Sequence, residues 1–277
     1  NLGVVMGLLA QKGVDNITFI TSKELGSFGN WVEQLIAEST GKNGKGILPV
    51  VGEEALEPSY YSNDRLFVYL KLENDSTYDN KVNELITSGH PVIQIELKDI
   101  YELGGEFFRW EMAVVIAGWE IGIQPFDQPN VESAKILARR LLDEYSKSGV
   151  LKEPEANFRY DDFKIYSNDN SDNLESLIKN QFGSDDIEFR SKGNQYISIQ
   201  AYVKPDYEIN KAIQKLRTEL QKKFKSAVTV GYGPRFLHST GQLHKGDAGK
   251  GVFIQLISES EQILAIPDKA GSDESIM

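Results

Sequence analysis

Glu38 lies where a carboxylate can act as a base. It stands near the end of the amphipathic segment 31–40, shortly before Gly41, which can end a helix in the left-handed conformation. The negative pole of the helix dipole opposes charge on a carboxylate at that end, and partial burial acts in the same direction. Both effects favour proton uptake, so we predict Glu38 as a general base. A surface glutamate beside a turn is the alternative interpretation.

Gln128, Glu132 and Lys135 form a second group of polar side chains with regular spacing. A helix over this stretch would carry all three along one face near its amino end. The ring and hydroxyl oxygens of a sugar require such hydrogen-bonding groups, and an ammonium group suits proton transfer or a developing oxyanion. The other interpretation is an exposed ion pair between Glu132 and Lys135.

Residues 231–246 concentrate basic side chains among glycines, directly after a predicted strand. Arg235, His238 and His244 lie in this segment, which holds two of the three histidines of the chain. Glycines let a backbone approach a ligand closely, so we predict a ligand-contacting loop, with structural roles for both histidines as the alternative. We expect no metal site, because a third ligand at a recognisable spacing is missing and the chain has no cysteine.

The elements that must position these residues follow two patterns. The first half alternates β-rich runs at 17–21, 46–51, 66–70 and 92–97 with helical periods, which predicts a parallel α/β sheet flanked by helices. The apolar segment 106–121 predicts a helix that is buried against the sheet or at a subunit contact. After Pro129, which fits the first turn of a helix, an apolar stripe predicts another helix.

Polar residues around position 150 predict a domain boundary, which divides the chain into 1–150 and 151–277. The second part predicts strands at 196–203, 228–232 and 251–257 around a helix at 207–225, as in a small α+β unit, and a disordered tail at 271–277. The basic residues of the helix at 207–225 are interpreted as a solvated outer face.

Composition narrows the class of protein. The 277 residues carry a net charge of −11, which disfavours nucleic acid and anionic membranes as partners. No apolar run approaches the roughly 20 residues that span a bilayer, so we expect a cytoplasmic protein. Because residues 1–10 resemble the middle of a helix, we also expect a fragment of a longer polypeptide.

Two of the segments resemble phosphoglucose isomerases. The sequence Glu38-Ser39-Thr40-Gly41-Lys42 is similar to the family's E-S-N-G-K segment, with threonine in place of asparagine, and residues 127–135 resemble its D-Q-x-x-V-E-x-x-K segment. The resemblance covers roughly residues 1–147 and implies the sugar isomerase (SIS) fold. It also implies that Glu38 moves a proton between C1 and C2 of a sugar phosphate, that Gln128 contacts substrate and that Lys135 contacts or opens the sugar ring.

The second half resembles the isomerase part of bifunctional transaldolase/glucose-6-phosphate isomerases, which carry a G-P-R-F-L-H-S-T-G-Q-L-H-K-G segment. By this resemblance Arg235 and Gln242 contact substrate, and either His238 or His244 opens the ring, with His238 preferred. In ordinary phosphoglucose isomerases the histidine segment lies between the glutamate and lysine segments, whereas here it comes last. The family's phosphate-binding loop and enediolate-stabilising arginine lie upstream of the glutamate segment and map to no residue of this chain.

The resemblance implies interconversion of glucose 6-phosphate and fructose 6-phosphate through an enediolate, without a cofactor. The partners implied are a sugar phosphate, a missing upstream isomerase or transaldolase segment and a second subunit in a homodimer. Alone, this chain is expected to bind sugar phosphate weakly and to turn over poorly. The alternatives are a non-catalytic phosphosugar sensor of the same fold, in which Glu38 and Lys135 would be dispensable, and an amidotransferase-type isomerase half.

Overall fold

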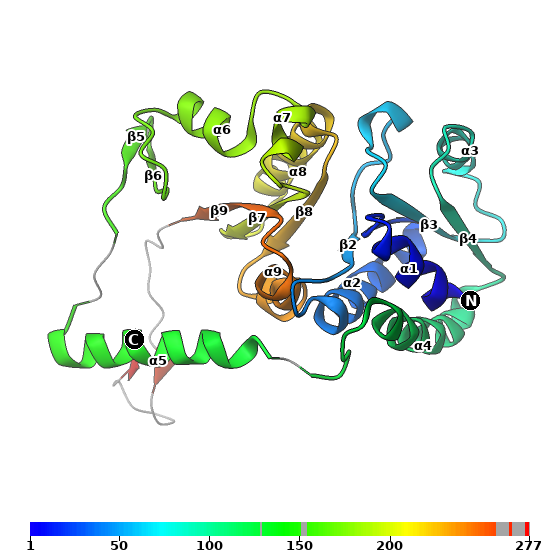
Figure 1. The fold of residues 1–277 in the computed structure, drawn as a ribbon, viewed down its shortest axis with the longest axis horizontal. Coiled ribbons are helices and arrows are strands. Elements are labelled where there is room, and N and C mark those ends of the chain that lie inside the picture. The colour runs from blue at the N-terminus through cyan, green and yellow to red at the C-terminus, as the bar shows by residue number, and fades with distance from the viewer. Residues whose placement is uncertain (128, 151–153, 259–265, 268–274, 277) are drawn as a thin grey trace.

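The amino-terminal part of the chain forms a parallel four-stranded sheet with helices on both faces (Figure 1). The computed structural model describes residues 1–127, 129–150, 154–258, 266–267 and 275–276, and the side chains of 131–134 and of 266–276 lie outside this description. The strand order is β2-β1-β3-β4, and β1 pairs in parallel with both β2 and β3. The predicted α/β class with a parallel sheet flanked by helices is confirmed. The elements are α1 (Leu2–Gln11), β1 (Asn16–Thr21), α2 (Gly26–Thr40), β2 (Leu48–Val50), β3 (Arg65–Leu72), α3 (Asp79–Thr87), β4 (Val92–Leu97) and α4 (Leu103–Ile121).

Alternate residues of the central strands enter two separate cores, as the two-residue period of a strand requires. Phe19 of β1 packs with α1, α2 and α4, and its ring lies 5.2 Å from that of the fully buried Trp110. Ile20, the next residue, packs with α3 on the opposite face. The predicted helix at 106–121 is therefore confirmed as one that packs against the sheet, although it begins earlier, at Leu103.

A second parallel sheet has the strand order β8-β7-β9. Helices α6, α7 and α8 supply apolar side chains to the core on one face of this sheet, and α9 packs on the other face. The expected small α+β unit thus has an all-parallel main sheet, because α8 and α9 connect its successive strands. Its elements are β5 (Phe158–Tyr160), β6 (Phe163–Ile165), α6 (Leu174–Phe182), α7 (Asp186–Ser191), β7 (Tyr196–Tyr202), α8 (Tyr207–Phe224), β8 (Ala227–Tyr232), α9 (Gly241–Gly246) and β9 (Gly251–Ile257), with β5 and β6 antiparallel. Beyond them, β10 (Ile266–Pro267) pairs with β11 (Ser275–Ile276), and the rest of the predicted tail lies outside the described residues.

Helix α5 (Val131–Ser148) connects the two sheets and projects away from both of them (Figure 1). Several of its apolar side chains are more than half exposed, among them Ile136 at 59% and Leu142 at 60%. The helix itself was predicted, whereas its position outside the packed body was not. The boundary near residue 150 stays a prediction.

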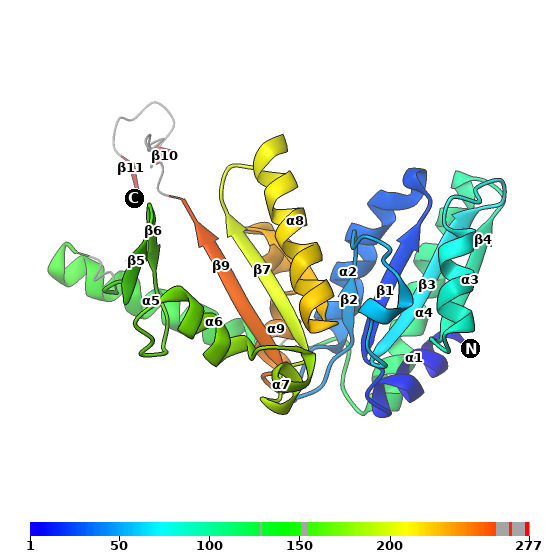
Figure 2. The ribbon, with the colours of Figure 1, turned by 90° about the horizontal axis from the view of Figure 1, so that it is seen from above.

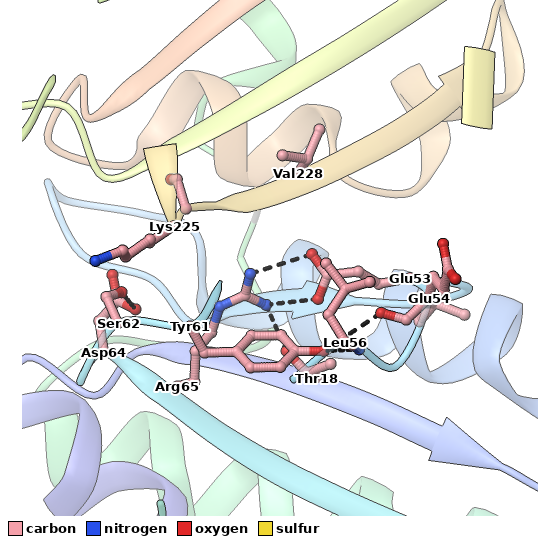
Figure 3. A network of polar contacts seen from close by, with 12 residues as sticks. Thr18, Glu53, Glu54, Leu56, Tyr61, Ser62, Asp64, Arg65, Lys225 and Val228 are labelled. Atoms are coloured by element: carbon pink, nitrogen blue, oxygen red, sulfur yellow. Dashed lines mark hydrogen bonds and ion pairs between the residues drawn. The ribbon is translucent and has the colours of Figure 1, made fainter. Parts of the chain in front are cut away.

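The two sheets lie side by side, and the arrowheads of β1, β7 and β9 point to the same end of the molecule (Figure 2). A polar network runs along their junction (Figure 3). At its centre, Arg65 is fully buried and donates to both carboxylate oxygens of Glu53 at 3.0 and 3.1 Å, and to Thr18 at 2.6 Å. From α7, which packs on the second sheet, Arg190 pairs with Asp64 at 2.9 Å. These charges of Arg65, Glu53, Arg190 and Asp64 are thus paired, as burial requires.

Arg217 shows where the predicted solvated face of α8 is wrong. Its side chain is buried and donates to the carbonyl of Val228 at 2.8 Å and to the carbonyl of Val51 at 2.9 Å. One carbonyl belongs to β8 of the second sheet, and the other directly follows β2 of the first. Since a guanidinium presents several donors in a fixed fork, it can bridge two backbones in this way.

Asp15 is a buried titratable residue at the junction of the two sheets. Its carboxylate lies 3.5 Å from the ammonium of Lys250, and one of its oxygens is buried without a hydrogen-bond partner among the described residues. Burial raises the pKa of Asp15 to about 6, with Lys250 opposing the shift and Asp64 adding to it. Between roughly pH 4 and this value the folded state holds a proton that the unfolded state has lost. The free energy of unfolding should therefore fall as pH rises through this window.

We expect Asp15→Asn to remove this dependence. Relative to the variant, the wild type should lose about 2–3 kcal/mol of stability between pH 4 and pH 7, because only the wild type must ionise a buried carboxyl. Urea unfolding at several pH values measures the difference. Asp143→Asn, at an exposed site on α5, is the control and should run parallel to the wild type. Parallel curves for Asp15→Asn would contradict the prediction.

Candidate active site

Glu38 lies two residues before the end of α2, on a turn held by Thr40. The Thr40 hydroxyl donates to the carbonyl of Ile36 at 2.7 Å and accepts from the amide of Ile47 at 3.0 Å. Thr40 is fully buried, so its hydroxyl fixes the path of the chain from α2 toward β2. Glu38 itself is partly exposed, and Gln34 donates to its carboxylate at 3.2 Å. The carboxylate thus lies at the edge of a turn that is held by buried hydrogen bonds.

Gly41 ends α2, but not in the predicted left-handed conformation. Its φ is −76° and its ψ is 79°, so that prediction was wrong. Glycine is required here for close packing instead, because a Cβ at this position would overlap the backbone of Leu243 in α9. The same contact repeats in reverse, since a Cβ on Gly246 would overlap the carbonyl of Gly41. The 231–246 segment therefore packs directly on the turn that follows Glu38.

That segment is also not the predicted glycine-rich loop. It folds into the 3-10 turn η4 (Arg235–His238) and the helix α9. Phe236 and Leu243 are buried and anchor these two elements. Burial of such anchors outweighs the low helix propensity of the glycines.

Lys42 brings a third segment to the same turn. Its side chain is 1% exposed, and its ammonium donates to the carbonyls of Pro125, at 3.1 Å, and of Asp127. Burial lowers the pKa of Lys42, while the negative charges of Asp127 and Glu38 oppose the shift. The lysine therefore links the Glu38 turn to the chain that leads into α5.

Gln242 joins the three segments. It is buried, and its Nε2 donates to the carbonyl of Gly41 at 2.9 Å and to Oδ1 of Asn130 at 3.0 Å. Arg235 is exposed at the start of η4 and lies near Glu33 of α2. Residues from three distant parts of the sequence thus meet around Gly41.

The two histidines of this segment have different surroundings. His244 points toward β7 and β9, where its Nδ1 lies 3.0 Å from the Tyr196 hydroxyl and its Nε2 lies 3.4 Å from Ser198 Oγ. Burial lowers the pKa of His244 to about 4, so the ring is neutral at pH 7. His238 is exposed at the end of η4. Of the two, His238 therefore presents its side chain to solvent.

Several known proteins are similar to parts of this chain. A probable glucose-6-phosphate isomerase from Methanococcus maripaludis is 34% identical over an alignment that covers 43% of this chain and 35% of that protein. The glucose-6-phosphate isomerase of Methanocaldococcus jannaschii is 28% identical and covers 50% of this chain and 44% of that protein. A solved structure of a hypothetical protein from Thermus thermophilus has a TM-score of 0.44 at 18% identity, covering 50% of this chain and 44% of that one. No protein-family model matches.

The chain is similar to glucose-6-phosphate isomerases. The similarity is partial, and the chain spans less than half the length of these two curated relatives. It supports the general prediction that this sequence is isomerase-like.

The lysine predicted for the site is less closely tied to the Glu38 turn. Lys135 lies on α5, one turn after its start, with an exposed side chain. Because α5 begins at Val131, Gln128 precedes the helix, and it lies outside the described residues, as does the side chain of Glu132. Of the three side chains predicted to share one helix face, the structure thus describes only that of Lys135.

Glu33 is a residue of the site that the sequence patterns missed. It lies on α2, five residues before Glu38, and its carboxylate interacts with the Ser239 hydroxyl and with the charges of Arg235 and Arg217. Burial raises the pKa of Glu33, and these three partners oppose the shift. Its position among the buried residues of an amphipathic helix was the available signal.

The described residues offer neither a metal site nor a membrane-spanning helix. No group of three or more histidine or acidic side chains there is arranged to hold a metal ion. In that same part of the chain, no helix is both long and apolar enough to cross a membrane.

Proposed function

We propose that this chain carries the base and ring-handling part of an aldose–ketose isomerase site that interconverts glucose 6-phosphate and fructose 6-phosphate. The observation that carries the proposal is the meeting of three segments at the turn after Glu38, through Lys42 and Gln242. Similarity to proteins named glucose-6-phosphate isomerase supports the reaction class. The SIS fold and a fused transaldolase are the finer parts of this proposal.

Glu38 is the base in this mechanism. As a carboxylate it takes the proton from the carbon next to the carbonyl, which leaves a cis-enediolate, and returns the proton to the neighbouring carbon. A hydroxyl proton passes from the second oxygen of the enediolate to the first, so the carbonyl moves by one carbon and aldose becomes ketose without any oxidant. Glu38 suits this role because it is partly exposed at the edge of a turn held by buried residues. One carboxylate serves both directions.

Ring opening requires proton transfer at the ring oxygen and at the anomeric hydroxyl. We assign it to Lys135 together with His238, because the resemblance singles them out and both side chains are exposed. Arg235, exposed beside His238, is assigned to substrate binding. The enediolate also needs a positive or hydrogen-bonding partner, and the phosphate needs a binding loop. We place both of these in the remainder of a longer protein, since the similar isomerases are more than twice as long as the matched region.

A coupled assay of fructose 6-phosphate isomerisation on the full-length protein tests the proposal. Lys135→Met should lower kcat about 100-fold, at the lower end of what a positioned acid or base contributes. Lys147→Met, an exposed lysine in the last turn of the same helix, is the matched control and should keep wild-type activity. A full-length protein that binds sugar phosphate without converting it would contradict the proposal and favour a sensor.

A further inference from the structure

The side-chain amide of Gln242 is committed to protein atoms. Its Nε2 has two protons, and it donates to the carbonyl of Gly41 and to Oδ1 of Asn130 at 2.9 and 3.0 Å. Both donors of the amide are thus used. The remaining atom, Oε1, is buried and has no hydrogen-bond partner among the described residues. A substrate hydroxyl could reach Gln242 only through this oxygen.

The side chain of Asn130 hydrogen-bonds to α9 at both ends of its amide. Its Oδ1 accepts from Gln242, and its Nδ2 donates to the carbonyl of Lys245 at 3.4 Å, one turn further along α9. Both ends of the Asn130 amide therefore contact α9. Asn130 is the residue before the first turn of α5, so this contact fixes the start of the helix that carries Lys135.

The Glu38 turn is held to the same helix from its other side. The amide of Gly44 donates to the carbonyl of Gly246 at 2.8 Å, and Gly41 packs against Leu243. Helix α9 thus contacts the chain that follows the base and the chain that precedes the lysine. The side chain of Gln242 hydrogen-bonds to both.

We propose that Gln242 and Asn130 are a positioning pair, which sets the distance between the Glu38 turn and the start of α5. This inference rests on the proposed function. It assigns Gln242 to holding Gly41 and Asn130 in place, instead of the predicted contact with substrate. The physical reason is the steep dependence of proton transfer on geometry, since a shift of about 1 Å can cost about 100-fold in rate. Substrate affinity depends less on this one separation.

Substitutions at Gln242 separate positioning from substrate contact. Gln242→Met removes the donors and the acceptor at similar size, whereas Gln242→Glu keeps an acceptor and loses the donors. A positioning role predicts that each variant lowers kcat of the full-length protein about 100-fold while KM changes little. A substrate contact through Oε1 predicts instead that Gln242→Met raises KM, because the variant lacks the acceptor. Gln255→Met, at an exposed position on β9, is the control and should behave as wild type.

A double-mutant cycle and hydrogen exchange complete the test. Gln242→Met and Asn130→Ala should each lower kcat, and the double variant should be no slower than either one, because the pair acts as a unit. Amides at 39–46 and at Phe126, Asp127 and Asn130 should exchange faster in Gln242→Met, whereas those of β3 should not change. Additive losses in kcat, or unchanged exchange in both segments, would overturn the positioning pair. An inactive full-length wild type would instead contradict the proposed function, and the exchange experiment would still report on the pair.

Discussion

Glu38→Gln should lower kcat for isomerisation of fructose 6-phosphate by about 1,000-fold in the full-length protein, within the range that a general base contributes. Glutamine has the size of glutamate and can still interact with Gln34, but it cannot accept the carbon-bound proton. The fold should be preserved, because Glu38 is partly exposed and the turn is held by Thr40. The loss should therefore appear in kcat, with unchanged unfolding by urea.

Deuterium exchange sharpens this experiment. In heavy water, an enediolate mechanism exchanges part of the transferred proton with solvent while it resides on the base, so the wild type should incorporate deuterium at the carbon that receives it. Glu38→Gln should incorporate almost none. Glu111→Gln, an exposed glutamate on α4, is the matched control and should keep wild-type turnover and exchange. Wild-type kcat in Glu38→Gln would show that another group is the base.

Removing one charge from the Arg65–Glu53 pair should be the most destabilising of these substitutions. Side-chain exposure is 0% for Arg65 and 1% for Glu53, so Glu53→Gln leaves a guanidinium buried without its counterion. The expected loss is about 3–5 kcal/mol in the free energy of unfolding. The double variant Glu53→Gln/Arg65→Met should lose less than the two single losses combined, because neither charge of the pair is left without the other.

Urea unfolding at pH 7 measures these losses. Arg140→Met is the matched control, since Arg140 and Glu144 form an i,i+4 pair on α5 with side chains 75% and 57% exposed. Such a pair contributes about 0–1 kcal/mol. If Glu53→Gln lost no more than Arg140→Met, the junction would not be held by this pair. The polar network in Figure 3 would then be incidental to stability.

The strand pattern of the sequence was enough to predict the parallel α/β class. Strands buried on both faces, such as β1 and β3, are rich in β-branched, aromatic and aliphatic residues, and helical periods separate them, so their local signal is strong. The helix α5 was predictable for the same reason. Its exposure was not, because an amphipathic pattern specifies an apolar face without specifying what covers it.

Residues 231–246 show the limit of local patterns most directly. Their glycines predicted a loop, yet Gly246 is needed for close packing, because its backbone meets that of Gly41 and leaves no room for a Cβ. Glycine has two uses, positive φ and close approach, and a sequence does not distinguish between them. Arg217 is a similar case. It lies four residues after the buried Ile213, on the same face of α8, but its charge predicted a solvated side chain. Only the tertiary structure brings the carbonyls of Val51 and Val228 to its guanidinium.

For the site, the sequence by itself determined which side chains are available: a glutamate before a turn, a lysine on a helix, and two histidines near an arginine. Tertiary structure alone decided that the Glu38 turn, the chain before α5 and α9 are joined through Lys42 and Gln242. It also distinguished His244, which faces β7, from the exposed His238. The physical reason is that these contacts join residues up to 201 positions apart, whereas local patterns extend over only a few turns of chain.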